Sequence, residues 1–121
     1  MKKLRKRIKI WTTSRADKEF SLYIRSRDKI CQRCKRGKLQ VKLDCSHFWS
    51  RNRSSTRYNE FNCICLCRGC HYRWEWEKAG EYMEFMKKRL GQKKYKELYK
   101  LAHSSIPRRE AIMNLMSWLN K

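Results

Sequence analysis

The sequence predicts a small α+β protein in which two short β segments are followed by amphipathic helices. The β prediction rests on Leu39, Val41 and Leu43, which alternate with polar residues as in a half-buried strand. The helical prediction rests on apolar residues that recur every three to four positions in several stretches, giving each stretch one apolar face. At 121 residues, the chain has the length of one domain or of a compact core with arms.

The charge of the chain is strongly unbalanced. Thirty-two Lys and Arg residues stand against 11 Asp and Glu, a formal net charge of +21, which indicates a polyanionic partner. Aromatic residues make up 12% of the chain, too many for a disordered basic tail, so the chain is expected to fold. No stretch approaches the roughly 20 apolar residues that span a bilayer, and the N-terminus does not resemble a signal peptide. We therefore expect a soluble intracellular protein.

Four of the seven cysteines form two Cys-x2-Cys pairs, Cys31 with Cys34 and Cys67 with Cys70. Each pair offers two thiolates on one tight turn, and zinc binds two such turns as a tetrahedral site with four sulfur ligands. A disulfide scaffold is disfavoured, because the number of cysteines is odd and no secretion signal is expected. The sequence thus predicts a structural zinc ion on these residues, the alternative being buried free thiols.

The N-terminal part is expected to comprise an arm and a helix. The first ten residues carry six basic side chains and no acid, which predicts an arm that is either solvated or lies along phosphates. Apolar residues at helical spacing predict a helix over residues 14–28, with Thr12, Thr13 or Ser14 as its N-cap.

The two β segments are expected on either side of a loop. The alternation described above predicts that the first segment runs into His47. Residues 49–59 are polar, rich in Arg and Ser and without a period, which predicts a loop. The second β segment is expected over residues 62–66, where the chain leads into the second cysteine pair.

Helices are expected to make up the C-terminal half. Helix-forming residues predict a helix over residues 71–88 that starts at the second cysteine pair, with Gly80 as a break or bend. Gly91 is a natural C-cap before a helix over residues 92–103, and Pro107 marks the start of a third helix. The expected organisation is a basic arm (1–12), a core with its preceding helix (13–91) and a helical extension (92–121).

Three polar residues beside the cysteine pairs occur in an order that indicates phosphate chemistry. His47 at the end of the first β segment, Asn62 at the start of the second and His71 in the following helical turn predict a β–β–α arrangement around a cation. Hydrolysis of a phosphodiester needs a base for water and charge to neutralise the phosphate oxygens. His47 is the candidate base, because an imidazole with a pKa of about 6.5 accepts a proton at neutral pH. A hard divalent cation would neutralise the phosphate.

This order resembles the HNH nucleases, in particular their zinc-knuckle branch. Asn62 is followed by CICL and then by CRGCH, which matches the spacing of that branch residue for residue. The chain is also similar to the phage recombination endonucleases called NinG or Rap. That similarity covers about residues 16–71, through the segments ADKEFSLYIRSRD, CQRC, CSHFWSR, TRYNEFN and CRGCH, and extends more loosely through EYMEFMKKRLG.

The resemblance implies a fold, an activity and roles for site residues. The fold would be a ββα-metal (HNH, or His-Me finger) core with an N-terminal helix and C-terminal helices. The reaction would be the hydrolysis of DNA phosphodiesters with Mg²⁺ or Mn²⁺. His47 would act as the base, Asn62 would orient the base or its loop, and His71 would bind the cation. NinG-like proteins are associated with branched DNA, so we expect a phage-encoded protein in a bacterial cytoplasm that cuts Holliday junctions. Two cuts on a symmetric junction favour a homodimer, which the C-terminal helices could join.

The second cation ligand departs from the family pattern. Most HNH proteins place Asp, His or Glu directly before the base, whereas this chain has Ser46. Asp44 lies on the same side of a regular strand as Ser46 and is the first candidate, with an ion pair to a nearby Lys or Arg as the alternative. Glu75 is the second candidate, because it lies one helical turn beyond His71; its alternative is a solvated helix carboxylate.

Three arginines, Arg51, Arg53 and Arg57, lie between the expected base and Asn62. Guanidinium groups bind phosphate bidentately, so we expect these residues to contact the DNA backbone, the alternative being a solvated loop.

Two other interpretations stay open. His47 follows Cys45 by two residues, and if it belongs to a zinc site the protein is a zinc-ribbon DNA-binding module without nuclease activity. An RNA-binding protein is the weaker interpretation, because it rests on charge and aromatic content alone. Asn62 and His71 at the family spacing favour the nuclease, because a zinc ribbon needs only the thiolates.

Overall fold

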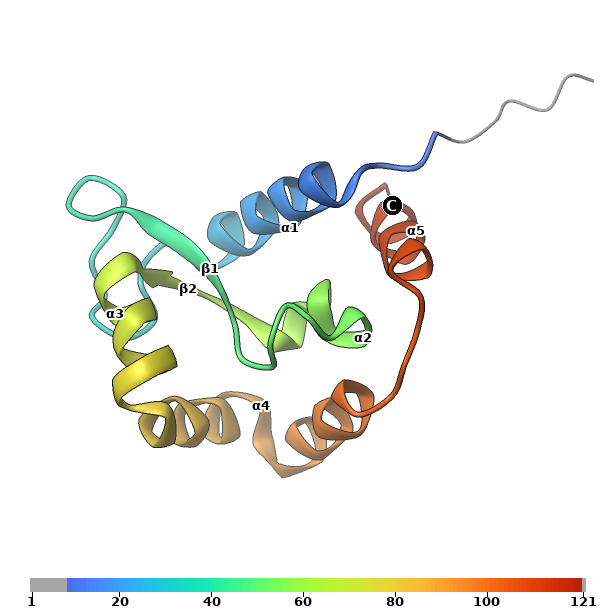
Figure 1. Ribbon diagram of the computed structural model, residues 1–121. Helices are drawn as coiled ribbons and strands as arrows, with labels where there is room; N and C mark the ends of the chain where they lie inside the picture. Colours follow the sequence, from blue (N-terminus) through green and yellow to red (C-terminus); the bar gives the residue numbers. More distant parts are fainter. Residues whose placement is uncertain (1–8, 121) are drawn as a thin grey trace, which may run out of the picture.

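The structure, a computed structural model, describes residues 9–120 and has a two-stranded antiparallel sheet with helices around it (Figure 1). The α+β fold class is therefore confirmed, with a mostly helical composition. The strands are β1 (Leu43–His47) and β2 (Cys63–Cys67), and the helices are α1 (Thr13–Asp28), α2 (Ser54–Arg57), α3 (Arg68–Tyr72), α4 (Ala79–Ala102) and α5 (Arg108–Leu119). A 3₁₀ turn, η1 (Glu60–Asn62), precedes β2, and a π-helical turn, η2 (Arg73–Glu77), follows α3.

The first helix forms where its apolar spacing predicts. The side chain of Thr12 caps α1 by accepting a hydrogen bond from the Arg15 backbone N–H at 3.1 Å, which satisfies one of the free N–H groups of the first turn. Ala16, Phe20 and Ile24, four residues apart, form the buried face of α1. The described residues just before α1 also pack against this core, whereas most of the predicted basic arm lies outside the described residues.

The first strand is shorter than its sequence pattern predicts. Leu43 pairs with Cys67 at one end of the sheet, and His47 pairs with Cys63 at the other. Leu39 is 95% exposed and lies outside the strand. The Gly37 carbonyl accepts hydrogen bonds from the two N–H groups at positions 40 and 41, so the backbone there forms a turn and does not pair with a second strand.

Three helical segments, α3, η2 and the first part of α4, take the place of the single helix predicted over residues 71–88. The interruption lies at Lys78 (φ −134°, ψ 53°) rather than at Gly80, because the Lys78 N–H bonds back to the Arg73 carbonyl at 2.6 Å and closes the π turn. Gly91 ends the next helical stretch, as predicted, with a left-handed φ of 77° that other residues rarely adopt. Helix α5 begins at Arg108, one residue later than expected, with Pro107 as its N-cap.

Strand β2 separates two hydrophobic clusters, because its alternate side chains point to opposite sides. Ile64 and Leu66 pack with Trp74 and Met86 on the side of α3 and α4. Cys63 packs on the other side, in a cluster that α1 and α5 complete.

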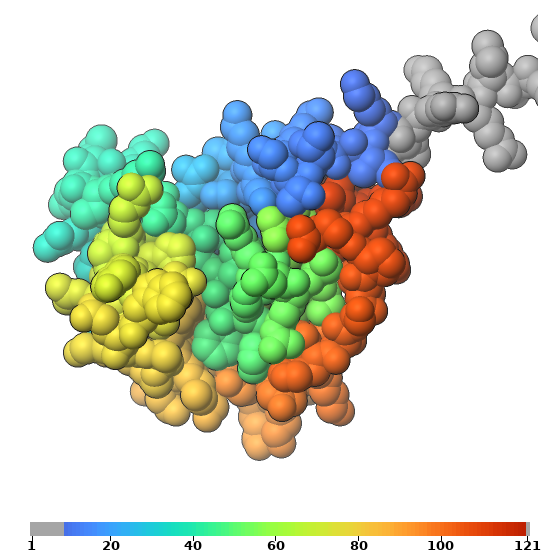
Figure 2. Space-filling view, in the orientation of Figure 1, coloured from blue at the N-terminus to red at the C-terminus, as the bar shows by residue number. Residues whose placement is uncertain are grey.

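The last helix packs against the first within the same chain. Figure 2 shows the surfaces of α1 and α5 in contact. The buried face of α5 consists of Ala111, Ile112 and Leu115. Because this face is already covered within the chain, a homodimer joined through α5 would have to use another face of the helix.

Within residues 9–120, no helix combines the length and the hydrophobicity that a transmembrane segment requires.

Candidate functional site

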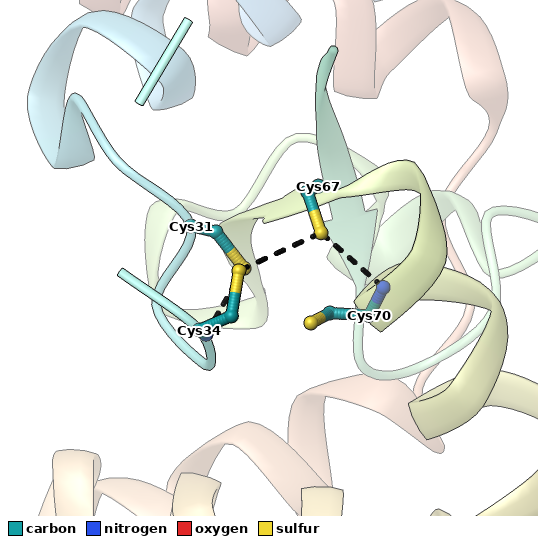
Figure 3. A group of neighbouring side chains, drawn as sticks. All are labelled: Cys31, Cys34, Cys67 and Cys70. Atoms are coloured by element: carbon teal, nitrogen blue, oxygen red, sulfur yellow. Dashed lines mark hydrogen bonds between the residues drawn. The ribbon is translucent and has the colours of Figure 1, made fainter. Parts of the chain in front are cut away.

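The two cysteine pairs meet beside the junction of β2 and α3 (Figure 3). The four Sγ atoms of Cys31, Cys34, Cys67 and Cys70 lie within 4.8 Å of one another, and those of Cys34 and Cys67 are 3.8 Å apart. Sulfur ligands of a tetrahedral zinc ion, with Zn–S bonds of about 2.3 Å, are about 3.8 Å from each other. This four-cysteine site thus has the composition and the spacing that can hold a metal such as zinc, as predicted.

Backbone N–H groups point at the sulfur atoms of this cluster. The Cys34 N–H donates to Cys31 Sγ, and the Cys70 N–H donates to Cys67 Sγ, both at 3.4 Å (Figure 3). Burial alone would raise the pKa of the Cys31 thiol, but the N–H donors around it lower that pKa to about 7. Arg33 also donates to Cys70 Sγ at 3.5 Å. These donors favour the thiolate, which is the form that binds metal, whereas burial raises the pKa of the Cys34 and Cys70 thiols.

His47, at the end of β1, has the protonation state of a base. Its Nε2 atom lies 2.8 Å from the backbone oxygen of Arg57. Because a carbonyl oxygen only accepts hydrogen bonds, Nε2 carries the proton and Nδ1 carries the free lone pair. Burial lowers the pKa of His47 to about 4, and the positive charges of Arg51 and Arg57 act in the same direction. The imidazole is therefore neutral at physiological pH.

Asn62 holds the backbone that follows His47. The Asn62 side chain is fully buried. Its Oδ1 accepts a hydrogen bond from the Trp49 N–H at 2.8 Å, and its Nδ2 donates to the carbonyl oxygens of Trp49 and Thr56 at 3.0 and 3.1 Å. One amide group thus ties the start of the loop that follows β1 to α2.

Asp44 and His71, the two predicted cation ligands, are neighbours. Asp44 Oδ2 lies 3.3 Å from His71 Nδ1. Adjacent ligands of an octahedral ion with bonds of about 2.1 Å are about 3.0 Å apart, so this pair fits a Mg²⁺-sized cation. Glu75 Oε2 lies 3.6 Å from the other ring nitrogen, Nε2. The Glu75 side chain is 51% exposed and lies just beyond hydrogen-bond distance of the ring. Ser46 is buried and does not take part.

A surface pocket of about 370 Å³ brings these residues together. His47, Asp44 and His71 line it, beside Cys45. A larger pocket of about 480 Å³ between α2 and α5 contains none of the predicted site residues. Four basic side chains also line the smaller pocket: Arg25, Lys42, Arg51 and Arg68.

The three loop arginines have different environments. Arg51 is exposed and lines the pocket. Arg57 is only 7% exposed, and its guanidinium forms a bidentate ion pair with Asp17 at 2.7 and 2.9 Å. Its predicted contact with DNA does not fit this position, because its donors are already used inside the chain. Arg53 is half-buried and donates to the Ala102 carbonyl at 2.8 Å, so it too has an internal partner.

Sequence reasoning missed the contribution of α1 to the pocket. Asp17, Ser21 and Arg25 follow one another at four-residue intervals, and all three line it. This spacing places them on one side of the helix. A search for polar as well as apolar residues at helical spacing would have found this stripe.

Known proteins offer no guide to the site. Comparisons of the chain with protein-family models, curated proteins and solved structures find no match.

Proposed function

We propose that the protein is a metal-dependent HNH-type DNA endonuclease, and that it acts on branched DNA such as Holliday junctions in the manner of the NinG or Rap family. The observation that carries this proposal is the pocket in which His47, Asp44 and His71 come together. A neutral imidazole, two ligands for a hard cation and a rim of basic side chains are what hydrolysis of a phosphodiester requires.

His47 is the proposed general base. Its Nδ1 lone pair accepts a proton from a water molecule, and the resulting hydroxide attacks phosphorus in line with the leaving 3′-oxygen. The products are a 5′-phosphate and a 3′-hydroxyl. The hydrogen bond from Nε2 to the Arg57 carbonyl stabilises the ring as it becomes positively charged. Because the imidazole is neutral at physiological pH, it needs no prior deprotonation.

Asp44 and His71 are the proposed ligands of the catalytic cation. A hard cation such as Mg²⁺ or Mn²⁺ supplies positive charge to the scissile phosphate and to the leaving oxygen. With Nε2 protonated, His71 can present its Nδ1 lone pair to a cation, and the Glu75 carboxylate, 3.6 Å from Nε2, favours that tautomer by its charge. Carboxylates commonly orient metal-binding histidines in this way.

Asn62 has the proposed role of a positioning residue. Its Nδ2 bonds to the Thr56 carbonyl, one residue before the carbonyl that holds His47. The amide therefore acts on the base through the loop backbone.

Exposed basic side chains are the proposed contacts with the DNA backbone. Arg51 keeps this role from the sequence prediction, since its side chain is exposed at the pocket. The Arg68 side chain is 68% exposed, and although its Nε lies 3.9 Å from Asp44 Oδ2, in the ion pair that the sequence left open for Asp44, its guanidinium can still reach phosphate. Lys42 is also exposed there. Burial and internal partners make Arg53 and Arg57 the weaker candidates.

The alternative is a zinc-ribbon module that binds DNA without cutting it. Four thiolates complete one tetrahedral site without His47. A zinc ribbon does not need Asp44, His47 and His71 to line one pocket, so their presence together favours the nuclease.

The test compares cleavage and binding for three histidine variants. Plasmid, linear duplex and a synthetic four-way junction are incubated with Mg²⁺ or Mn²⁺ and with wild type, His47→Ala, His71→Ala or His103→Ala at equal zinc content. His103 is the matched control, because it is exposed at the end of α4 and outside the pocket. We expect wild type and His103→Ala to cut, with the junction preferred, and the other two variants to bind without cutting. Binding without cleavage by all four proteins would contradict the nuclease and support the zinc-ribbon module.

A further inference from the structure

Cys45, His47 and Cys63 form a second cluster of metal-binding side chains, apart from the four-cysteine site. One ligand atom from each lies within 4.8 Å of the other two. The sheet brings them together, because His47 pairs directly with Cys63 across the two strands and Cys45 precedes His47 by two residues on the same face. Neither cysteine belongs to a Cys-x2-Cys pair, so the sequence indicates Cys45 and His47 by their spacing but gives no sign of Cys63.

We propose that Cys45, His47 and Cys63 form a second metal site, which takes a thiophilic ion such as Zn²⁺. The two Sγ atoms and Nδ1 of His47 are the ligands. Nε2 already donates a hydrogen bond to the Arg57 carbonyl. Histidines that bind a metal through one ring nitrogen typically donate the N–H of the other nitrogen to a carbonyl or a carboxylate in the same way. Three protein ligands leave the fourth tetrahedral position open.

The charge of the complex suits its location. Binding displaces one proton from each thiol, so two thiolates, one neutral imidazole and a divalent ion have a net charge of zero. Cys63 is 1% exposed, and a neutral complex avoids the cost of placing an uncompensated charge there. Thiolate ligands also select against Mg²⁺, which prefers oxygen.

The ion can enter from the pocket described above. Cys45 and His47 line this pocket, whereas Cys63 lies behind them in the core. The open coordination position therefore faces the pocket, where a water molecule or a phosphate oxygen can occupy it.

Occupancy of this site has a consequence that rests on the proposed function. An ion bound to Nδ1 of His47 takes the lone pair that the general base needs. The nuclease would then require one zinc ion, at the four-cysteine site, and be inhibited by a second. The zinc content of the protein would set its activity.

The site is tested by titrating the metal-free protein with Co²⁺, whose absorption spectrum reports thiolate ligands and tetrahedral geometry. Wild type is compared with Cys45→Ser and with Cys65→Ser. Cys65 is the matched control, because it is buried in the same sheet but lies outside both clusters. We expect two equivalents with thiolate-to-cobalt bands for wild type and for Cys65→Ser, and one for Cys45→Ser. A single equivalent in wild type, or equal stoichiometry in the two variants, overturns the proposal.

A measurement on wild type alone avoids the folding of variants. Iodoacetamide labelling with mass spectrometry follows the alkylation of Cys45, and we expect the second equivalent of Zn²⁺ to slow it at least about tenfold, because a metal-bound thiolate is a poorer nucleophile than a free one. An unchanged rate contradicts the site.

Cleavage with Mg²⁺, titrated with Zn²⁺ beyond one equivalent, then tests the consequence for activity. Loss of cleavage in wild type but not in Cys45→Ser supports it. Equal loss in both proteins overturns it. Two bound equivalents in a protein that never cuts leave the site standing and refute the nuclease.

Discussion

The hydroxyl oxygen of Ser46 lies 2.8 Å from the hydroxyl oxygen of Tyr82, and both side chains are buried. This bond links β1 to α4 through the core. The position before His47 is therefore a packing position, and a small side chain with one hydroxyl fits it. Asp44, two residues earlier on the same strand, faces His71 instead.

Removing both of these hydroxyls should destabilise the protein by less than the sum of the two single changes. Ser46→Ala and Tyr82→Phe each leave the other hydroxyl buried without a partner, which costs about 1–2 kcal/mol of unfolding free energy. The double variant should lose about 1 kcal/mol less than the sum. Urea unfolding of the four proteins at saturating zinc measures this coupling; strictly additive losses would show that the bond contributes nothing.

Removal of metal should unfold the core. The four-cysteine site joins the turn after α1 to β2 and α3, and the free energy of zinc binding to such sites is largely folding free energy. We expect a chelator, or Cys31→Ser, to abolish most of the helical circular dichroism at 25 °C or to lower Tm by more than about 15 °C. Cys65→Ser should keep the zinc of this site and its helicity. An unchanged spectrum in the metal-free protein would show that the four-cysteine site does not stabilise the fold.

The titration of His47 should make the protein less stable as the pH falls. In the unfolded chain its pKa is about 6.5, and in the folded chain it is about 4, so the unfolded state binds more protons between these values. Wild type should therefore lose about 2 kcal/mol from pH 7 to pH 5, relative to His47→Gln. The glutamine still donates to the Arg57 carbonyl but does not titrate. A difference between the two proteins that stays constant with pH would contradict the lowered pKa.

Asn62→Ala should be far more damaging than the same change at a nearby asparagine. It removes three hydrogen bonds from a fully buried side chain, at a cost of about 2–4 kcal/mol. Asn59→Ala removes a single cap bond to the Phe61 N–H and should cost about 1 kcal/mol. Chemical unfolding compares the two, and equal losses would argue against the positioning role of Asn62.

Arg51 and Arg57 should separate DNA binding from stability. Arg57→Ala leaves the half-buried Asp17 carboxylate without its ion pair and with only the Tyr58 hydroxyl as a donor; it should cost about 3 kcal/mol of stability, with little change in the salt dependence of DNA binding. Arg51→Ala should leave stability within about 0.5 kcal/mol but weaken binding, and should reduce the slope of log K against log salt by about one. The reverse pattern would return Arg57 to the DNA interface.

The elements that sequence predicted well are those specified by local chemistry. The capping threonine of α1, the cysteine spacing and the left-handed Gly91 each depend on a few neighbouring residues. The failures came from longer-range effects. Leu39 continues an alternating pattern, yet it has no partner strand within residues 9–120, because a turn takes up the backbone bonds around it. The alternating apolar pattern alone does not show whether a partner strand is present.

The residues of the site were predicted more accurately than the surroundings of their side chains. His47, Asp44 and His71 were singled out by residue type and order, and they do converge. Arg57 was assigned to the DNA interface because it lies between His47 and Asn62 in sequence, but it forms a buried ion pair with Asp17, forty residues away on α1. The two cysteines of the second cluster come together only through strand register, which no spacing rule encodes.

Cys34 and Cys67 are 33 positions apart in sequence, and the segment between them contains β1, α2 and nearly all of β2. A metal ion that stays bound in denaturant would hold this segment as a closed loop, and closing a loop of that length costs about 4 kcal/mol of chain entropy. A chain that keeps its metal ion when it unfolds would still have this loop closed, so it would not lose that entropy again when it refolds. Refolding should then be fast after a short exposure to denaturant and slow after the ion has left, so the dissociation rate of the metal would set how long the unfolded protein stays able to refold quickly.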